Sequence, residues 1–161
     1  MSPRASKDSR RRSFYIWRDK PSDDPKGIAF PDRETSNWER DKKSGQYYLH
    51  RFYRFQPDLN VANPDVRDEI AKVVGFWLQL GVAGFRMDAV PFMLELDGIA
   101  EQVDGDPHEW LRSLRAFASR RRGDTVLLGE VNTGLKDLAR FFGDEDGDQL
   151  NMQFAFLLNQ N

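Results

Sequence analysis

The chain has 161 residues, of which 24 are Lys or Arg and 26 are Asp or Glu, so its formal net charge is −2. This balance and the absence of a long apolar run argue against a nucleic-acid or membrane partner. The chain has no cysteine, which excludes disulfides and thiolate metal sites. Its basic N-terminus lacks an apolar core of signal-peptide length, and we expect a cytoplasmic protein consisting of one domain or part of a larger one.

The first third of the chain is rich in turn residues and isolated aromatics. Residues 18–46 mix Pro, Gly, Asp, Ser and Lys with aromatic side chains, which predicts a long ordered loop region rather than a linker. The segment YYLHRFYRF at 47–55 has the composition of a strand. The segment QPDLN at 56–60 is typical of a turn.

The rest of the chain alternates helices with strands. Asn63 is a good N-cap, Pro64 suits the first helical position, and Gly81 ends the helical pattern that follows. Such alternation is typical of βαβ units and a parallel sheet, so the predicted fold class is α/β. The further predicted elements are a strand over 82–88, a helix from Asp106 to Gly123, a strand over 125–132, a helix over 135–142 and a strand over 150–158.

The strand GVAGFRMDAV carries two opposite charges on one face. Successive side chains of a strand point to opposite faces, so Arg86 and Asp88 share a face and reach the carboxyl end of the strand together. Burying such a pair is costly unless it is well hydrogen-bonded. A site is therefore a better explanation of this pair than a core.

Asp88 and Glu130 lie at the carboxyl ends of consecutive predicted parallel strands, the edge where α/β folds hold active sites. Neighbouring strands lie about 4.8 Å apart, and retaining glycoside hydrolysis needs two carboxyl groups about 5–5.5 Å apart. Arg86 would keep Asp88 ionised, while Glu130 would need a raised pKa to hold a proton. The spacing alone leaves three interpretations open: glycosidic chemistry, another α/β enzyme such as a Mg²⁺-dependent one, and a structural salt bridge.

Three motifs resemble conserved regions of the α-amylase superfamily, glycoside hydrolase family 13. They are QPDLN at 56–60, GFRMDAV at 84–90 and LLGEVN at 127–132. The resemblance covers most of residues 10–160 and is greatest to the branch that isomerises maltose to trehalose. It implies part of a (β/α)₈ TIM barrel, about strands 4 to 6, over residues 61–161. It also implies that residues 1–60 are the carboxyl part of a subdomain inserted between barrel strand 3 and helix 3.

The resemblance also implies roles for single residues. Asp88 matches the family nucleophile and Glu130 its general acid/base. The remaining matches are expected to bind substrate or hold the nucleophile: Arg86, Ala89, Phe92 and Asn132. Asp58 is expected to fix its loop rather than to touch sugar.

The family's first and fourth conserved regions have no match in this chain, and neither His50 nor His108 replaces their histidines. His50 is expected to be structural and His108 to be exposed. We therefore expect an internal piece of a larger enzyme, inactive by itself, whose parent acts on an α-glucoside such as maltose. The alternatives are an α-glucosidase or oligo-1,6-glucosidase, and a non-catalytic fragment.

No cofactor is expected for the chemistry. Ca²⁺ occurs in parts of this family, with ligands expected mostly in segments that this chain does not contain. The acidic segment GDEDGD at 143–148 lacks the glutamate that an EF-hand needs at its twelfth position, and we expect it to be a solvated loop. The sequence does not define an oligomeric state.

Overall fold

The computed structural model describes residues 9, 11–21, 28–94, 106–144 and 147–154. Their contacts divide the chain into two compact units, Met1–Val66 and Arg67–Asn161. The division falls within the first turn of helix α1, which covers Pro64–Gln79. None of the described helices combines the length and apolar character needed to span a membrane.

The first unit is built on a small antiparallel sheet. Its strands follow the order β1-β3-β2, with Trp17 paired to Tyr48 and Glu39 also paired to Tyr48. A further bridge joins Tyr15 to Leu59 and closes the unit. The elements are the 3-10 helix η1 (Arg12–Phe14), β1 (Trp17–Arg18), β2 (Trp38–Arg40) and β3 (Tyr47–Leu49).

The strand predicted over residues 47–55 is correct only for its first three residues, because the chain turns away after Leu49. The Asp58 N–H donates to the Leu49 carbonyl at 3.0 Å, and the Asp58 carboxylate accepts the Arg51 N–H at 3.2 Å. These bonds replace the ladder that a longer strand would make. Asp58 therefore fixes the loop in the way that the sequence indicated.

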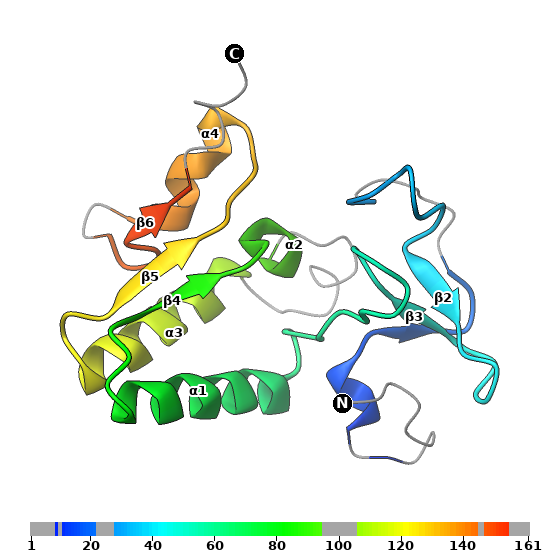
Figure 1. Cartoon of the computed structure of the whole chain (residues 1–161), viewed down its shortest axis with the longest axis horizontal. Coiled ribbons are helices and arrows are strands. Elements are labelled where there is room, and N and C mark those ends of the chain that lie inside the picture. Colours follow the sequence, from blue (N-terminus) through cyan, green and yellow to red (C-terminus); the bar gives the residue numbers. More distant parts are fainter. Residues whose placement is uncertain (1–8, 10, 22–27, 95–105, 145–146, 155–161) are drawn as a thin grey trace. The chain divides into compact units, whose positions relative to one another are not determined.

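The second unit contains a parallel sheet in the order β4-β5-β6. Figure 1 shows these three strands side by side and pointing the same way, with α1 and α3 running below β4 and β5 in that view. This arrangement confirms the predicted α/β class with a parallel sheet. The elements after α1 are β4 (Gly84–Met87), α2 (Val90–Leu94), α3 (His108–Arg121), β5 (Val126–Gly129), α4 (Leu135–Leu138), η2 (Ala139–Phe142) and β6 (Met152–Gln153).

Helix ends follow the capping residues. The Asn63 side chain accepts the Asp65 N–H at 2.9 Å at the start of α1, and Gly81 ends this helix with a φ of 97°. The Asp106 side chain accepts the His108 N–H at 3.0 Å at the start of α3. These predicted boundaries are confirmed.

The predicted lengths of the later elements were too great. Pairing covers four residues in β4 and four in β5, because the chain turns into a new segment after each strand. The third predicted helix is one turn of α-helix followed by the 3-10 turn η2. The last predicted strand is paired only at Met152–Gln153, and the part beyond residue 154 lies outside the described residues.

The core of the second unit lies between the sheet and its helices. Leu111, Leu127 and Phe141 are fully buried, and Leu150 is nearly so. Among the apolar side chains of α1, Val74 and Leu78 are buried, while Val73 and Trp77 are exposed. Gly75 of α1 lies next to α3, where a Cβ would be 3.4 Å from the Phe117 ring.

The backbones of β4 and β5 approach closely at Gly84. A Cβ at this position would lie 2.6 Å from the carbonyl oxygen of Val126 on β5. Only glycine fits this contact without movement of the two strands. The register that Gly84 permits continues directly to the sheet edge where the candidate site lies.

Candidate active site

Two carboxylates follow two paired strands. β4 ends at Met87 and β5 at Gly129, and these two residues are partners in the parallel ladder. Asp88 is the next residue after β4 and Glu130 the next after β5. The Glu130 N–H donates to the Met87 carbonyl at 2.8 Å, so the ladder continues as far as the second carboxylate. Asp88 and Glu130 therefore lie together at the carboxyl edge of the sheet, as the period-two argument predicted.

The chain turns sharply immediately after Asp88. Ala89 has a φ of 47°, and the short helix α2 begins at the next residue. The Val90 N–H donates to the Glu130 carbonyl at 3.0 Å. This turn was not predicted from the sequence, which gave no capping signal between Asp88 and Pro91.

Arg86 contacts both carboxylates. Its Nη1 lies 2.6 Å from Asp88 Oδ1, and its Nη2 bonds to Glu130 Oε2. The Glu130 side chain is 30% exposed, compared with 65% for Asp88. The two carboxyl groups therefore differ in hydration although they share one cation.

The pKa of Glu130 is raised above its ordinary value. Burial raises the pKa of Glu130, and the hydrogen bond and charge of Asp88 raise it further. The Arg86 charge opposes this rise without cancelling it. The direction of the shift agrees with the requirement derived from the sequence.

The other residues predicted to bind substrate surround this pair to different degrees. Ala89 directly follows Asp88, and Phe92 lies in α2, where its N–H donates to the Ala89 carbonyl at 3.0 Å. Asn132 is exposed, two residues beyond Glu130. Their contact with a substrate stays a prediction.

Phe154 is a further residue near the carboxylates that the sequence did not indicate. It follows β6, donates its N–H to the Gly129 carbonyl at 3.1 Å, and places its ring 5.6 Å from the Arg86 guanidinium. It therefore lies at the same sheet edge as the carboxylates. The strand predicted over 150–158 contains Phe154, whereas the pairing ends at Gln153, so the predicted length of the strand concealed that Phe154 follows its end.

The two histidines are both buried. His50 is 1% exposed, in agreement with a structural role, but His108 is 3% exposed and the prediction of an exposed side chain was wrong. His108 Nδ1 lies 2.7 Å from Gln149 Oε1, and its ring lies 5.0 Å from the Phe141 ring. The α3 N-terminus is covered by the segment leading to β6, which the sequence of α3 alone did not indicate.

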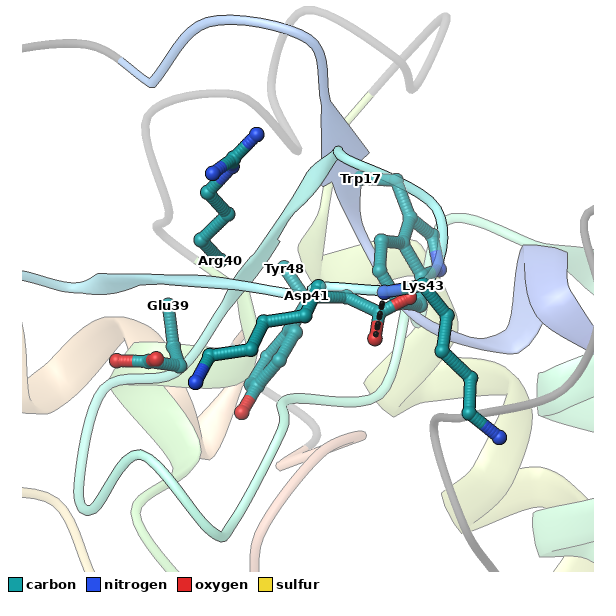
Figure 2. A pocket seen from close by; sticks show the side chains of 7 residues that line it. Trp17, Glu39, Arg40, Asp41, Lys43 and Tyr48 are labelled. Carbon is teal, nitrogen blue, oxygen red and sulfur yellow. Dashed lines mark hydrogen bonds between the residues drawn. The ribbon is translucent and has the colours of Figure 1, made fainter.

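A separate pocket of about 380 Å³ lies on the antiparallel sheet of the first unit (Figure 2). Trp17 and Tyr48 form an edge-to-face pair in it, with ring centroids 5.7 Å apart. Asp41 is held in the adjoining turn by the Lys43 and Ser44 N–H groups. This pocket contains none of the predicted site residues. In the described part of the chain, no group of three or more His, Cys, Asp or Glu side chains is arranged to hold a metal ion.

A parallel α/β sheet with two carboxylates and a bridging arginine at its carboxyl edge defines a class of protein. It is the class of α/β enzymes that use a carboxylate pair at the strand ends, as retaining glycoside hydrolases do. The family model described as "Alpha amylase, catalytic domain" matches residues 2–161. The chain belongs to this family, glycoside hydrolase family 13, whose members act on α-glucosides.

Curated relatives agree with this assignment. A trehalose synthase of Pimelobacter is 38% identical over 97% of this chain and 29% of its own length, and one of Thermus thermophilus is 40% identical over 91% and 15%. A glucan 1,6-alpha-glucosidase of Streptococcus pneumoniae is 36% identical over 92% of this chain and 27% of its own. The chain therefore spans less than a third of the length of these relatives.

Solved structures show the same fold. A variant of a trehalulose synthase matches with a TM-score of 0.79 and 32% identity, over 95% of this chain and 30% of that one. An inactive variant in complex with isomaltulose matches with a TM-score of 0.77 and 31% identity, over the same shares. These neighbours are barrel enzymes of the family, so the parallel sheet corresponds to part of an α/β barrel.

Proposed function

We propose that Asp88 and Glu130 perform a retaining double displacement on an α-glucoside. Asp88 attacks the anomeric carbon, and Glu130 gives its proton to the leaving oxygen. The bond from the sugar to the leaving group breaks as the bond to Asp88 forms. Glu130 then removes a proton from the incoming hydroxyl, which releases the sugar from Asp88 with its original configuration.

One observation carries this proposal: the two carboxylates follow paired residues of adjacent parallel strands and share the Arg86 guanidinium. The Arg86 guanidinium lies 2.6 Å from the Asp88 carboxylate, where it can orient this group as the nucleophile. The raised pKa of Glu130 favours its protonated form, which an acid needs. The different environments of the two carboxyl groups thus favour Asp88 as the nucleophile and Glu130 as the acid.

We further propose that the protein of which these residues form part isomerises maltose to trehalose. Relatives named trehalose synthase are 38–40% identical to this chain. Ala89, a small residue beside Asp88, suits an α-1,4 substrate. In this reaction the released glucose re-attacks the glucosyl group on Asp88 through a different hydroxyl, and a site that excludes water favours this outcome over hydrolysis.

Hydrolysis of α-glucosidic bonds is the second candidate. It is favoured by relatives named glucan 1,6-alpha-glucosidase and oligo-1,6-glucosidase, at 36% and 35% identity. Both candidates need the same roles for Asp88 and Glu130. In both, β4, β5 and β6 would be about the fourth to sixth barrel strands, and residues 1–60 would belong to the inserted subdomain.

The test uses the protein expressed from the complete reading frame that encodes this chain. Incubation with 5-fluoro-α-glucosyl fluoride, followed by peptide mass spectrometry, should find one glucosyl label, on Asp88. Nuclear magnetic resonance of maltose incubations should show trehalose formed faster than free glucose. Free glucose as the main product would favour the hydrolytic candidate.

Two variants test the assigned roles. Asp88→Asn should abolish both labelling and turnover. Glu130→Ala should still react with α-glucosyl fluoride, which needs no acid, and added azide should then yield α-glucosyl azide. A label on another residue, or a Glu130→Ala protein that azide does not rescue, would reject the mechanism.

A further inference from the structure

We propose that the left-handed backbone of Ala89 is a positioning device that sets the separation of Asp88 and Glu130. At Ala89, one residue after Asp88, the chain turns so that the next residue hydrogen-bonds to the end of β5. The inference rests on the proposed function of the two carboxylates. It assigns the role to the backbone of Ala89, independently of any contact between its methyl group and a sugar.

The backbone of Ala89 is unusual for a residue that has a Cβ. Its φ is 47°. Among the described residues, it is the only residue other than glycine that has a positive φ. The other described residues with positive φ are Gly45, Gly81, Gly143 and Gly147. Alanine is disfavoured in this region because its Cβ approaches the following carbonyl oxygen. A disfavoured conformation persists only where the surrounding structure holds it, and such residues cluster at functional sites.

The hydrogen bonds around Ala89 show what holds it. The Glu130 N–H donates to the Met87 carbonyl at 2.8 Å, and the Glu130 carbonyl accepts the Val90 N–H at 3.0 Å. The backbone of Glu130 is therefore fixed at both ends by the residues that flank Asp88 and Ala89. Val90 is fully buried, which fixes this turn against the core.

An extended conformation at Ala89 would break this arrangement. The chain would continue along the β4 direction, and the Val90 N–H would point away from β5. The Glu130 carbonyl would lose its donor, and the two carboxylates would no longer be held on adjacent, paired positions. The left-handed conformation of Ala89 thus allows the residues after β4 to hydrogen-bond to the residue that follows β5.

A competing explanation is that only the size of the side chain matters. Substitutions at Ala89 distinguish the two explanations. Asn tolerates the left-handed backbone conformation, whereas Val, which has a side chain of similar bulk, does not. Gly tolerates it best of all. Backbone control predicts that Asn behaves like Gly, whereas size control predicts that Asn behaves like Val.

The experiment compares Ala89→Gly, Ala89→Asn and Ala89→Val in the protein expressed from its complete reading frame. The measured quantity is the pH dependence of kcat and kcat/KM for maltose, because its leaving oxygen, unlike fluoride, needs the proton of Glu130. Ala89→Gly and Ala89→Asn should keep the alkaline limb of the wild-type profile. Ala89→Val should lower kcat for maltose about tenfold or more, with a smaller effect on KM.

The alkaline limb reports the geometry itself. Among the described residues, Arg86 and Asp88 are the charged groups that face Glu130, and Asp88 raises the Glu130 pKa more than Arg86 lowers it. Separating the carboxylates in Ala89→Val should therefore move the alkaline limb to lower pH, since Glu130 would lose its proton earlier. A change of substrate fit alone would lower the rate without moving this limb.

The outcomes are distinct. Similar behaviour of Asn and Val, or an unmoved alkaline limb in Val, would overturn the inference while the proposed function stands. A wild-type protein without a label on Asp88 would overturn both. If thermal melting shows that Ala89→Val does not fold, Ala89→Leu provides the same comparison with Asn, because its Cβ is not branched.

Discussion

Arg86 Nη1 lies 2.6 Å from Asp88 Oδ1, and both side chains are more than half exposed. An exposed ion pair contributes little to folding, because solvent screens it and ordering two side chains costs entropy. The value of this contact is therefore chemical: it orients one carboxylate while the same guanidinium reaches Glu130.

The first prediction concerns this cation. Arg86→Gln should lower kcat about a hundredfold, through loss of charge stabilisation at the nucleophile, and should change the melting temperature little. Because Arg86 lowers the Glu130 pKa, its removal should raise that pKa and move the alkaline limb of the pH profile to higher pH. Arg86→Lys, which keeps the charge without the forked geometry, is the matched control and should fall between wild type and Gln. A large loss of stability with kcat intact would show that the contact is structural.

The second prediction concerns the loop at Asp58. Burial raises its pKa from 3.8 to about 6, although the Arg51 N–H and charge act to lower it. The folded state therefore holds this proton more tightly than the unfolded state. The stability from this group is fully present below about pH 3.8 and is lost as the pH rises through about 6.

Asp58→Asn should remove that loss, because the amide oxygen can still accept the Arg51 N–H and carries no charge. Urea unfolding at a series of pH values between 4 and 7 measures the effect. The variant should gain stability relative to wild type as the pH rises across this range. Asp32→Asn, at an exposed position, is the control, and equal pH slopes in the Asp58→Asn and wild-type proteins would contradict the prediction.

The third prediction concerns the contact between β4 and β5. Gly84→Ala would place a Cβ 2.6 Å from the Val126 carbonyl oxygen, which is backbone and cannot rotate away. We expect a loss of about 1–3 kcal/mol in the free energy of unfolding. Activity should fall as well, because separating the strands separates the carboxylates that follow them. Gly123→Ala, where a Cβ meets nothing within 4 Å, should be nearly neutral, and equal effects of the two changes would reject the steric argument.

The fourth prediction concerns the buried pair of His108 and Gln149. The Gln149 amide nitrogen donates to the Arg140 carbonyl at 3.1 Å, so its oxygen faces His108, and His108 Nδ1 carries the hydrogen. Gln149→Leu should cost about 1–3 kcal/mol, because it leaves a buried donor without a partner. His108→Leu combined with Gln149→Leu should cost less than the sum of the two single changes. Additive losses in this double-mutant cycle would show that the pair is not coupled.

The features predicted correctly from the sequence are those that depend only on neighbouring residues. Asn63 and Gly81 marked the ends of α1, since capping depends on neighbouring residues alone. The alternation of side chains along β4 and β5 placed Arg86, Asp88 and Glu130 at one edge. Residues that act through period-two geometry are predictable without knowledge of the rest of the chain.

Features that depend on distant partners were not predictable in this way. His108 is buried because residues near 141 and 149 cover it, and the polar composition of the α3 N-terminus concealed this. The strand expected over 47–55 ends at Leu49, because Asp58 hydrogen-bonds to the Leu49 carbonyl and the Arg51 N–H. The turn at Ala89 depends on the Glu130 carbonyl, some forty residues along the chain. In each case the deciding partner lies outside the segment whose pattern gave the prediction.

The parallel sheet also has a consequence for how the chain behaves in solution. Its order is β4-β5-β6, so β4 and β6 each have one side that pairs with no other strand among the described residues. An open strand edge presents unpaired N–H and C=O groups in a fixed row and acts as a template for further strands. A barrel removes such edges by closing on itself. If this chain is produced by itself, we therefore expect concentration-dependent self-association through β4 and β6. Added βα units that pair with these edges should suppress it.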